Sequence, residues 1–226
     1  MRDLTIIYYT ANHAPEKFLK KNQEQLLKAA GDIPIISVSQ KPMDFGMNIC
    51  VGDIGRSHLN IYRQALIGAR AAATKYVAFA EDDILYSADH FDHIPQPGCF
   101  AYDMNIWALN TFYRPPSFCY NDRINFNGLI SERKLFIEAM EERFNKYPRD
   151  DMVQIKYWAE PSKYEKHLSV TIRKRELYHA NTPSVAFYHP AALSYEHLGR
   201  RKRIGKYVRI ELSPWGFAKD ILATYK

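Results

Sequence analysis

The stretch Lys75-Tyr76-Val77-Ala78-Phe79-Ala80-Glu81-Asp82-Asp83 decides the fold class of this chain. Residues 76–80 are an uninterrupted apolar run with the aromatic and β-branched content typical of a strand. The run ends abruptly in three consecutive carboxylates. We therefore expect a central strand whose carboxyl end carries an acidic cluster.

Strands and helices alternate in the residues that precede this strand. A β-branched and aromatic run leads into a polar stretch and a helix whose apolar residues recur at helical spacing until Gly31. Another strand follows, and Ser57 is a good N-cap for a second helix. The expected elements are a strand at 4–9, a helix at 15–30, a strand at 33–39 and a helix from 57 to about 73. This alternation predicts a Rossmann-type α/β fold, with a mostly parallel central sheet flanked by helices.

The second half of the chain has weaker patterns. We expect strands at 100–102, 106–109, 170–172 and 185–188, a polar turn at 121–128, and helices at 131–147 and 162–168. The C-terminal segment, with Trp215 and Phe217, should pack back on the body. Because 226 residues lie within the range of one domain, we predict a single domain.

The composition excludes several classes of protein. With 46% hydrophobic and 25% charged residues, the chain is neither disordered nor fibrous, and no apolar run approaches the length needed to cross a bilayer. Three widely spaced cysteines, Cys50, Cys99 and Cys119, fit neither a disulfide framework nor a zinc knuckle, so we expect them to be reduced and mostly structural. The N-terminus leads straight into a strand pattern, from which we expect a cytoplasmic protein.

Positive charge is concentrated in the last quarter of the chain. Residues 167–226 hold eleven Lys and Arg against four Asp and Glu, whereas residues 1–166 hold 20 against 21. The densest part lies at residues 199–209. Such a patch attracts phosphates of a nucleotide, a nucleic acid or a lipid headgroup. A solvated basic face is the alternative.

The acidic cluster lies where parallel α/β sheets bind ligands, at the carboxyl ends of the strands. Three adjacent carboxylates repel one another, and a shared hard divalent cation relieves that repulsion. The alternative is that Asp82 or Asp83 caps a helix, since acids are favoured at helix N-termini.

Several segments, taken in order, resemble the nucleotide-sugar core of GT-A-fold glycosyltransferases. A helix rich in small residues leads into a strand ending in an acidic motif similar to the DXD motif of that family, with Glu81 in its first position. Residues 126–131 are similar to the acceptor-side strand of the family, and residues 149–152 are similar to the acidic pair in which inverting members carry their base. The matching segments are residues 63–66, 68–73, 75–83, 126–131, 133–136 and 149–152.

The resemblance implies transfer of a sugar from a nucleotide-diphosphate donor, most simply a UDP-sugar, with Mn²⁺ or Mg²⁺. It implies a nucleotide-sugar half at 1–100, an acceptor and catalytic half at 101–198, and a basic segment at 199–226. The predicted metal ligands are Asp83, Glu81 and His189, with His197 as the rival histidine. The predicted donor-binding residues are Thr10 at the base, Asp82 at the ribose or sugar, and Arg56, Arg63, Arg200 and Lys202 at the phosphates.

An inverting transfer needs a carboxylate that accepts the proton of the acceptor hydroxyl. Asp151 is the first candidate, followed by Asp150, and then by Glu160 and Glu165. The alternative for the acidic pair is a turn after Pro148, where Asp is favoured for local hydrogen bonds.

The basic tail suits a polyanionic acceptor. A hydroxymethylated pyrimidine in DNA, as modified by bacteriophage enzymes, is favoured slightly over a lipid-linked bacterial surface glycan, because aromatic residues interleave with the cations. Two hypotheses of other classes stay open: a non-catalytic nucleic-acid-binding domain, and a metal-dependent nuclease or nucleotidyltransferase.

Overall fold

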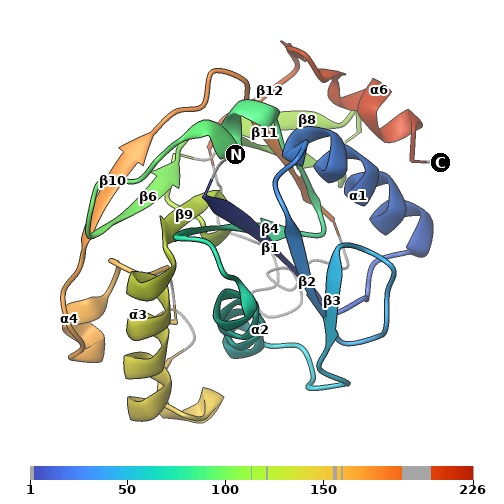
Figure 1. Ribbon diagram of the computed structural model, residues 1–226. Helices are drawn as coiled ribbons and strands as arrows, with labels where there is room; N and C mark the ends of the chain where they lie inside the picture. The colour runs from blue at the N-terminus through green and yellow to red at the C-terminus, as the bar shows by residue number, and fades with distance from the viewer. Residues whose placement is uncertain are drawn as a thin grey trace.

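The structure is a computed structural model that describes residues 3–112, 114–120, 122–154, 157–158, 160–189 and 205–225. Its centre is a seven-stranded sheet in the order β10-β6-β9-β4-β1-β2-β3 (Figure 1). All neighbours in this sheet are parallel except the two pairs that β9 makes. Its strands are β1 (Leu4–Thr10), β2 (Ile35–Ser39), β3 (Met47–Cys50), β4 (Tyr76–Glu81), β6 (Cys99–Asp103), β9 (Leu129–Glu132) and β10 (Lys174–Tyr178). The predicted single α/β domain with a mostly parallel sheet is confirmed.

Helices cover both faces of this sheet, and the pleat of β1 shows why. Ile6 and Tyr8 point to one face, where they pack with Leu26 of α1, while Ile7 and Tyr9 point to the other, where α2 and α3 pack. The result is a three-layer arrangement with a core on each face of the sheet. The helices are α1 (Glu16–Ala30), α2 (His58–Ala71) and α3 (Arg133–Lys146), and the shorter helical elements are α4 (Glu165–Leu168), α6 (Ala218–Ala223), η1 (Ala88–Asp92), η2 (Phe126–Gly128) and η3 (Asp150–Met152).

The start and the packing of α2 follow from two small residues. The Ser57 side chain accepts a hydrogen bond from the Asn60 backbone N–H at 3.1 Å, which confirms the predicted N-cap. Gly68 lies against β1, where a Cβ would come within 2.3 Å of Ile7 Cγ2. The missing side chain therefore lets α2 approach the middle of β1 closely.

A second sheet, in the order β12-β8-β7-β11-β5, was not predicted. Its strands are β5 (Ile84–Leu85), β7 (Ile106–Asn110), β8 (Ser117–Tyr120), β11 (Ser184–Tyr188) and β12 (Tyr207–Val208). Strand β5 follows directly from the acidic cluster, and β11 pairs antiparallel with it. This pairing brings the C-terminal end of β11 to the carboxyl end of β4.

The C-terminal segment packs on the second sheet, as predicted. Leu212, Ile221 and the partly buried Trp215 lie in one apolar cluster with residues of β8 and β11, whereas Phe217 is 41% exposed. The segment also contains the two-stranded pair of β13 (Glu211–Leu212) and β14 (Gly216–Phe217).

Three of the expected elements differ from the structure, and one of them is the helix expected at 162–168, which begins only at Glu165 as α4. Residues 170–172 form no strand, and β10 instead begins at Lys174, where parallel pairing with β6 begins opposite Cys99. The helix expected at 131–147 begins at Arg133, because Leu129–Glu132 pair with β4 and β6 as β9. Cys50, Cys99 and Cys119 are free thiols, as expected. Among the described residues, no helix is long and apolar enough to cross a membrane.

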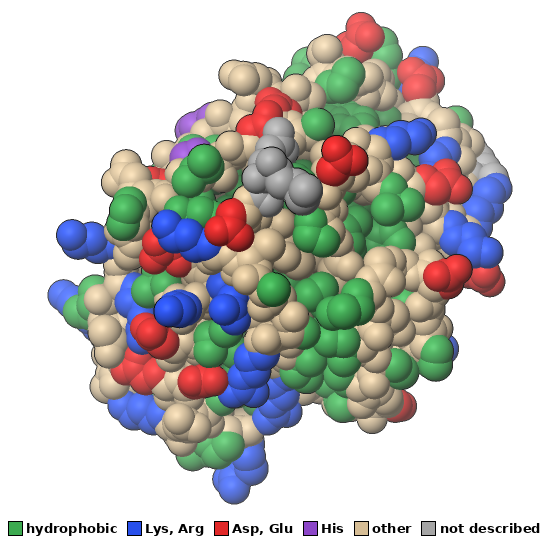
Figure 2. Space-filling model, in the orientation of Figure 1, with side chains coloured by type: hydrophobic (Ala, Val, Ile, Leu, Met, Phe, Trp, Pro, Cys, Tyr) green, Lys and Arg blue, Asp and Glu red, His purple; other side chains and the backbone are tan. Residues whose placement is uncertain are grey.

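The face formed by α3 and α4 has mixed charge. In Figure 2, Lys and Arg side chains alternate with acidic ones over these helices, at the lower left of the view. Several are paired: Arg70 lies 2.7 Å from Glu141, and Arg173 lies 2.8 Å from Glu142. This face is therefore not a continuous basic patch.

Candidate functional site

The acidic cluster is the turn that joins the two sheets. Glu81 is the last residue of β4, and Asp82 and Asp83 form the turn that enters β5. The next helical element, η1, begins only at Ala88. The alternative that Asp82 or Asp83 caps a helix is therefore wrong.

His189 and Asp83 are brought together by the register of β11 against β5. The Phe187 backbone N–H donates to the Asp83 carbonyl oxygen at 2.8 Å, which extends the pairing by one residue. Two residues later, His189 Nε2 lies 3.4 Å from Asp83 Oδ2. Both side chains are mostly buried, with 15% and 17% of their surface exposed. The predicted histidine and carboxylate thus face each other although they are far apart in the chain.

Thr10 and Arg56 also lie at this site. The Thr10 hydroxyl donates a short hydrogen bond to the Asp82 carboxylate, and Gln64 of α2 fixes the Thr10 carbonyl oxygen at 2.9 Å. Burial raises the pKa of Asp82 to about 6, aided by the charge of Asp83 and opposed by Thr10, His189 and Arg56. Arg56 is therefore close enough to act on the charge of the acidic turn.

The Glu81 carboxylate has hydrogen-bond partners other than Asp83 and His189. Its carboxylate accepts hydrogen bonds from the Tyr9 hydroxyl at 2.9 Å and from Asn127 Nδ2 at 3.1 Å. Burial is the main cause that raises the pKa of Glu81 to about 7, and the neighbouring charge of Asp83 adds to it. Glu81 is thus held by neutral donors, and its charged form is disfavoured.

The three predicted metal ligands do not form one cluster. Among the described residues, no three His, Cys, Asp or Glu side chains converge as a metal site does. Asp83 and His189 do converge, and a divalent cation held by one or two protein ligands is completed by phosphate oxygens and water in many nucleotide sites. The donor set fits an ion bound together with a diphosphate rather than a cage made of protein alone.

His189 is suited to lie beside a carboxylate. Burial lowers the pKa of His189, but the hydrogen bond and the charge of Asp83 outweigh it, so the net pKa is raised. In the protein without metal, the imidazolium thus pairs with Asp83 at mildly acidic pH. Metal binding requires the neutral imidazole, so it would release a proton.

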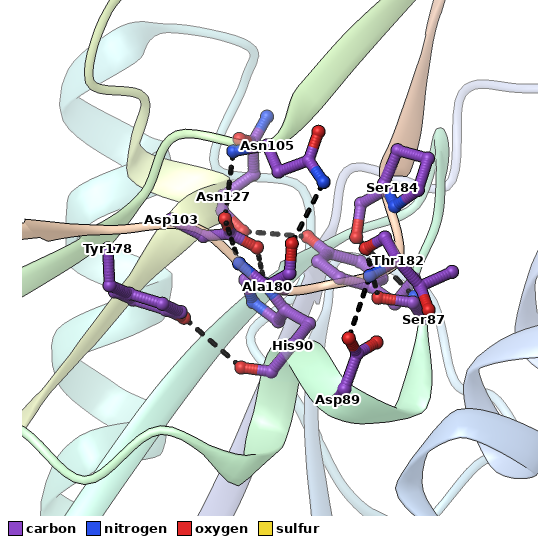
Figure 3. A network of polar contacts seen from close by, with 12 residues as sticks. Ser87, Asp89, His90, Asp103, Asn105, Asn127, Tyr178, Ala180, Thr182 and Ser184 are labelled. Atoms are coloured by element: carbon purple, nitrogen blue, oxygen red, sulfur yellow. Dashed lines mark hydrogen bonds and ion pairs between the residues drawn. The ribbon is translucent and has the colours of Figure 1, made fainter. Parts of the chain in front are cut away.

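A buried polar network, which the sequence analysis missed, supports β11 (Figure 3). Asp103 accepts hydrogen bonds from His90 Nδ1 at 2.8 Å and from the Ala180 backbone N–H at 3.1 Å. The Thr182 backbone N–H donates to Asp89 at 2.7 Å, and its carbonyl accepts from the Ser87 hydroxyl at 2.9 Å. These bonds tie the chain that precedes β11 to the chain that follows β5. They therefore fix the start of β11, the strand that His189 directly follows.

The other predicted residues lie elsewhere. Arg63 donates to the Pro148 carbonyl oxygen and lies over the Phe144 ring, so it joins α2 to α3. Asp150 and Asp151 are exposed on η3, shortly after Pro148. The alternative to a catalytic pair was a local turn at this place. His197, Arg200 and Lys202 lie outside the described residues. Their roles stay predictions.

The raised carboxyl pKa values predict how the stability of the metal-free protein depends on pH. Glu81 and Asp82 bind protons more tightly in the folded state, so the free energy of unfolding should fall as pH rises from about 4 to 7. Loss of the His189 proton acts in the same direction. We expect a loss of about 2–3 kcal/mol, or roughly 5–10 °C in Tm, between pH 5 and 7.5.

Thermal unfolding in a chelator at several pH values measures this loss. Glu81→Gln should flatten the dependence, whereas Glu142→Gln should not, because the pKa of Glu142 is lowered and acts only in more acidic solution. A Tm that is constant or rises from pH 5 to 7.5 would contradict the prediction.

The sequence matches no family model, and no curated protein sequence is similar to it at a significant level. Three solved structures are similar to this chain at 10–12% identity: bifunctional IspDF from Campylobacter jejuni (TM-score 0.45), a glycosyltransferase involved in glycosylation of the major capsid of PBCV-1 (0.44), and residues 1–349 of S. aureus TarS (0.48). The matches cover 79%, 81% and 81% of this chain and 50%, 92% and 60% of those chains. The chain thus spans only half of IspDF.

Proposed function

We propose that this chain is a metal-dependent glycosyltransferase that uses a nucleotide-diphosphate sugar. The observation that carries the proposal is the meeting of Asp83 and His189 at the carboxyl end of β4, with Thr10 and Arg56 beside the same acidic turn. Asp83 and His189 suit a metal ion, and the positive charge of Arg56 suits the diphosphate of such a donor. The end of β1 at Thr10 suits the nucleoside.

The chemistry of the transfer explains why each group is needed. The bond between the anomeric carbon and the diphosphate oxygen breaks, a bond to the acceptor oxygen forms, and the acceptor proton passes to a base. When bound, a divalent ion would neutralise the negative charge that develops on the leaving diphosphate. Asp83 and His189 would hold that ion, Arg56 would add positive charge, and Thr10 would lie near the base of the nucleotide.

The alternatives have less support. A nuclease or nucleotidyltransferase that uses two metal ions needs a larger set of acids, and no three of the described acidic, histidine or cysteine side chains converge. The non-catalytic DNA-binding hypothesis assumed that the acidic cluster caps a helix, and no helix begins there.

For the acceptor, we propose a polyanion, with duplex DNA carrying hydroxymethylated pyrimidines as the first probe and a lipid-linked glycan as the second. The support is the excess of cations in residues 167–226. Binding to DNA that weakens steeply with salt would support this choice, whereas binding that ignores salt, or none, would remove it.

A thermal-shift screen tests the donor class. UDP, GDP, CMP and their sugar conjugates should be tested with Mn²⁺, with Mg²⁺ and in a chelator, because a ligand that binds only the folded state raises Tm. We expect one nucleoside diphosphate to stabilise the protein only when metal is present. If none of them does so, the transferase proposal fails.

Asp151 is the proposed base. Its side chain is 72% exposed, and a hydrogen bond from Arg149 at 3.0 Å lowers its pKa, so it is ionised at neutral pH and open to an acceptor. Asp151→Asn should lower kcat by about a hundredfold or more with donor KM unchanged, as expected when general-base catalysis is lost. Asp150→Asn tests the second candidate base in the same way, and Asp44→Asn, at an exposed acid in the loop before β3, is the control. Turnover that is intact in Asp151→Asn at saturating donor would remove the assignment.

A further inference from the structure

Asn22 is a buried amide on the inner face of α1, and both ends of its side chain are bonded. It is 2% exposed. Its Nδ2 donates to the Asp82 carbonyl oxygen at 2.8 Å, and its Oδ1 accepts from the Tyr225 hydroxyl at 2.5 Å. Asparagine is a poor helix former, and a buried amide is costly unless it is bonded. Asn22 therefore joins the acidic turn to the C-terminal segment through two hydrogen bonds.

Tyr225 also contacts β11, the strand that leads to His189. Its ring lies 5.0 Å from the ring of Phe187 on β11 and 5.2 Å from that of Phe18 on α1. The Phe18 ring in turn lies 5.3 Å from the ring of His189. The Tyr225 side chain is thus linked to Asp82 by hydrogen bonds through Asn22. It is linked to His189 by ring contacts through Phe18, and it also packs on Phe187.

The end of the C-terminal segment is anchored to α1 from outside as well. Lys21 Nζ donates to the Thr224 carbonyl oxygen at 2.7 Å and lies 4.7 Å from the centre of the Tyr225 ring. Figure 1 shows α6 beside α1, on the same side of the molecule. The placement of Tyr225 is therefore fixed by several contacts.

We propose that Asn22 and Tyr225 are positioning residues that brace the acidic turn against β11. The turn is held at three points: Thr10 on the Asp82 carboxylate, Asn22 on the Asp82 carbonyl, and Phe187 on the Asp83 carbonyl. Without the brace, the Asp82 carbonyl oxygen loses its side-chain donor, so the peptide that joins Asp82 to Asp83 is less restrained and the separation of Asp83 from His189 is less closely fixed. The consequence for nucleotide binding rests on the proposed function, whereas the brace itself does not.

Hydrogen exchange of the full-length chain, without nucleotide, tests the brace. Tyr225→Phe keeps the ring and removes only the hydroxyl. We expect the amides of residues 82–85 and 187–189 to exchange at least about fivefold faster in this variant, because local opening of that segment becomes easier. The matched control is Tyr147→Phe, which removes a hydroxyl that donates to the Leu168 carbonyl oxygen at 2.8 Å, between α3 and α4.

Asn22→Ala is the second variant. It should accelerate the same amides, and the double variant should add little to either single one, because both changes break one chain of bonds. If exchange at these amides is unchanged, or rises as much in Tyr147→Phe, the proposed brace is refuted.

The affinity for UDP, with and without Mn²⁺, then measures how far Asn22 and Tyr225 contribute to metal-dependent nucleotide binding. Tyr225→Phe should weaken binding of UDP in Mn²⁺ roughly tenfold and leave metal-free binding unchanged, as loss of an outer-shell partner does at metal sites. An equal loss with and without Mn²⁺ would overturn the positioning role. If the wild-type chain binds no nucleoside diphosphate, the proposed function fails, and hydrogen exchange still decides the brace.

Discussion

Asp83→Asn is expected to weaken binding of a nucleoside diphosphate in Mn²⁺ by about a hundredfold or more, and to reduce turnover at least as much. Asparagine keeps the size of the side chain and removes its charge. It therefore removes the carboxylate that faces His189 Nε2 across 3.4 Å. Binding in a chelator should change little, because the substitution leaves Thr10, the proposed contact of the nucleoside, unchanged. Titration calorimetry with UDP in both conditions measures the difference.

The control for this variant is Asp44→Asn, which removes an exposed acid from a loop before β3. It separates loss of one ligand from a general change in net charge. Affinity that is equal in wild type and Asp83→Asn with Mn²⁺ would contradict the assignment of Asp83. A lower Tm in the variant without metal would show that folding, rather than ligation, has been lost, because removal of one of three crowded carboxylates should relieve repulsion.

His189→Ala is expected to weaken metal-dependent binding of the same nucleotide by about 10- to 100-fold. The loss should be larger in Mn²⁺ than in Mg²⁺, because Mg²⁺ prefers oxygen ligands and retains its water more strongly than metals that accept imidazole. This comparison of two metals separates ligation from packing against Phe18, which would affect both equally.

The matched control is His179→Ala, which removes an exposed histidine from the loop after β10. It should leave the affinity unchanged in both metals. The assignment of His189 as a ligand is wrong if His189→Ala binds the nucleotide as tightly as wild type, or loses the same factor in Mn²⁺, Mg²⁺ and chelator.

Much of the central sheet could be predicted because its elements are long and periodic. Strands β1 and β4 and helices α1 and α2 have regular apolar patterns, and Ser57 and Gly31 mark helix ends. The carboxyl end of β4 then identified the acidic turn, since the position of a site in a parallel sheet follows from topology. The resemblance to GT-A-fold glycosyltransferases implied a late histidine ligand, and His189 was the candidate that follows the strand expected at 185–188.

The second sheet could not be predicted in the same way. Strands β5 and β12 have two residues each, too few to show a period, and they exist only because partners far away in the chain pair with them. For the same reason the last two residues of β9, Ser131 and Glu132, were taken as the start of α3. Its pairing with β4 and β6 decides its structure, and the local sequence does not.

The position of Asn22 in the sequence indicates a buried polar residue, which the sequence analysis missed. It lies four residues after Phe18 and four before Leu26, so it belongs to the apolar face of α1. A polar residue at such a position predicts a buried hydrogen bond, but its partners, Asp82 and Tyr225, are 60 and 203 residues away. By contrast, the polar pair of Asp150 and Asp151 was equally consistent with a turn, and the structure places both residues on the exposed 3-10 helix η3.

Hydrogen exchange with and without a bound nucleotide tests most directly whether the acidic turn is the donor site. The wild-type chain should be measured in Mn²⁺, alone and with saturating UDP. We expect protection at three separate places that meet only in the fold: the end of β1 near Thr10, residues 82–85, and residues 187–189. Protection confined to another surface, or stabilising binding of UDP with no protection at the acidic turn, would contradict a donor site at this edge of the sheet.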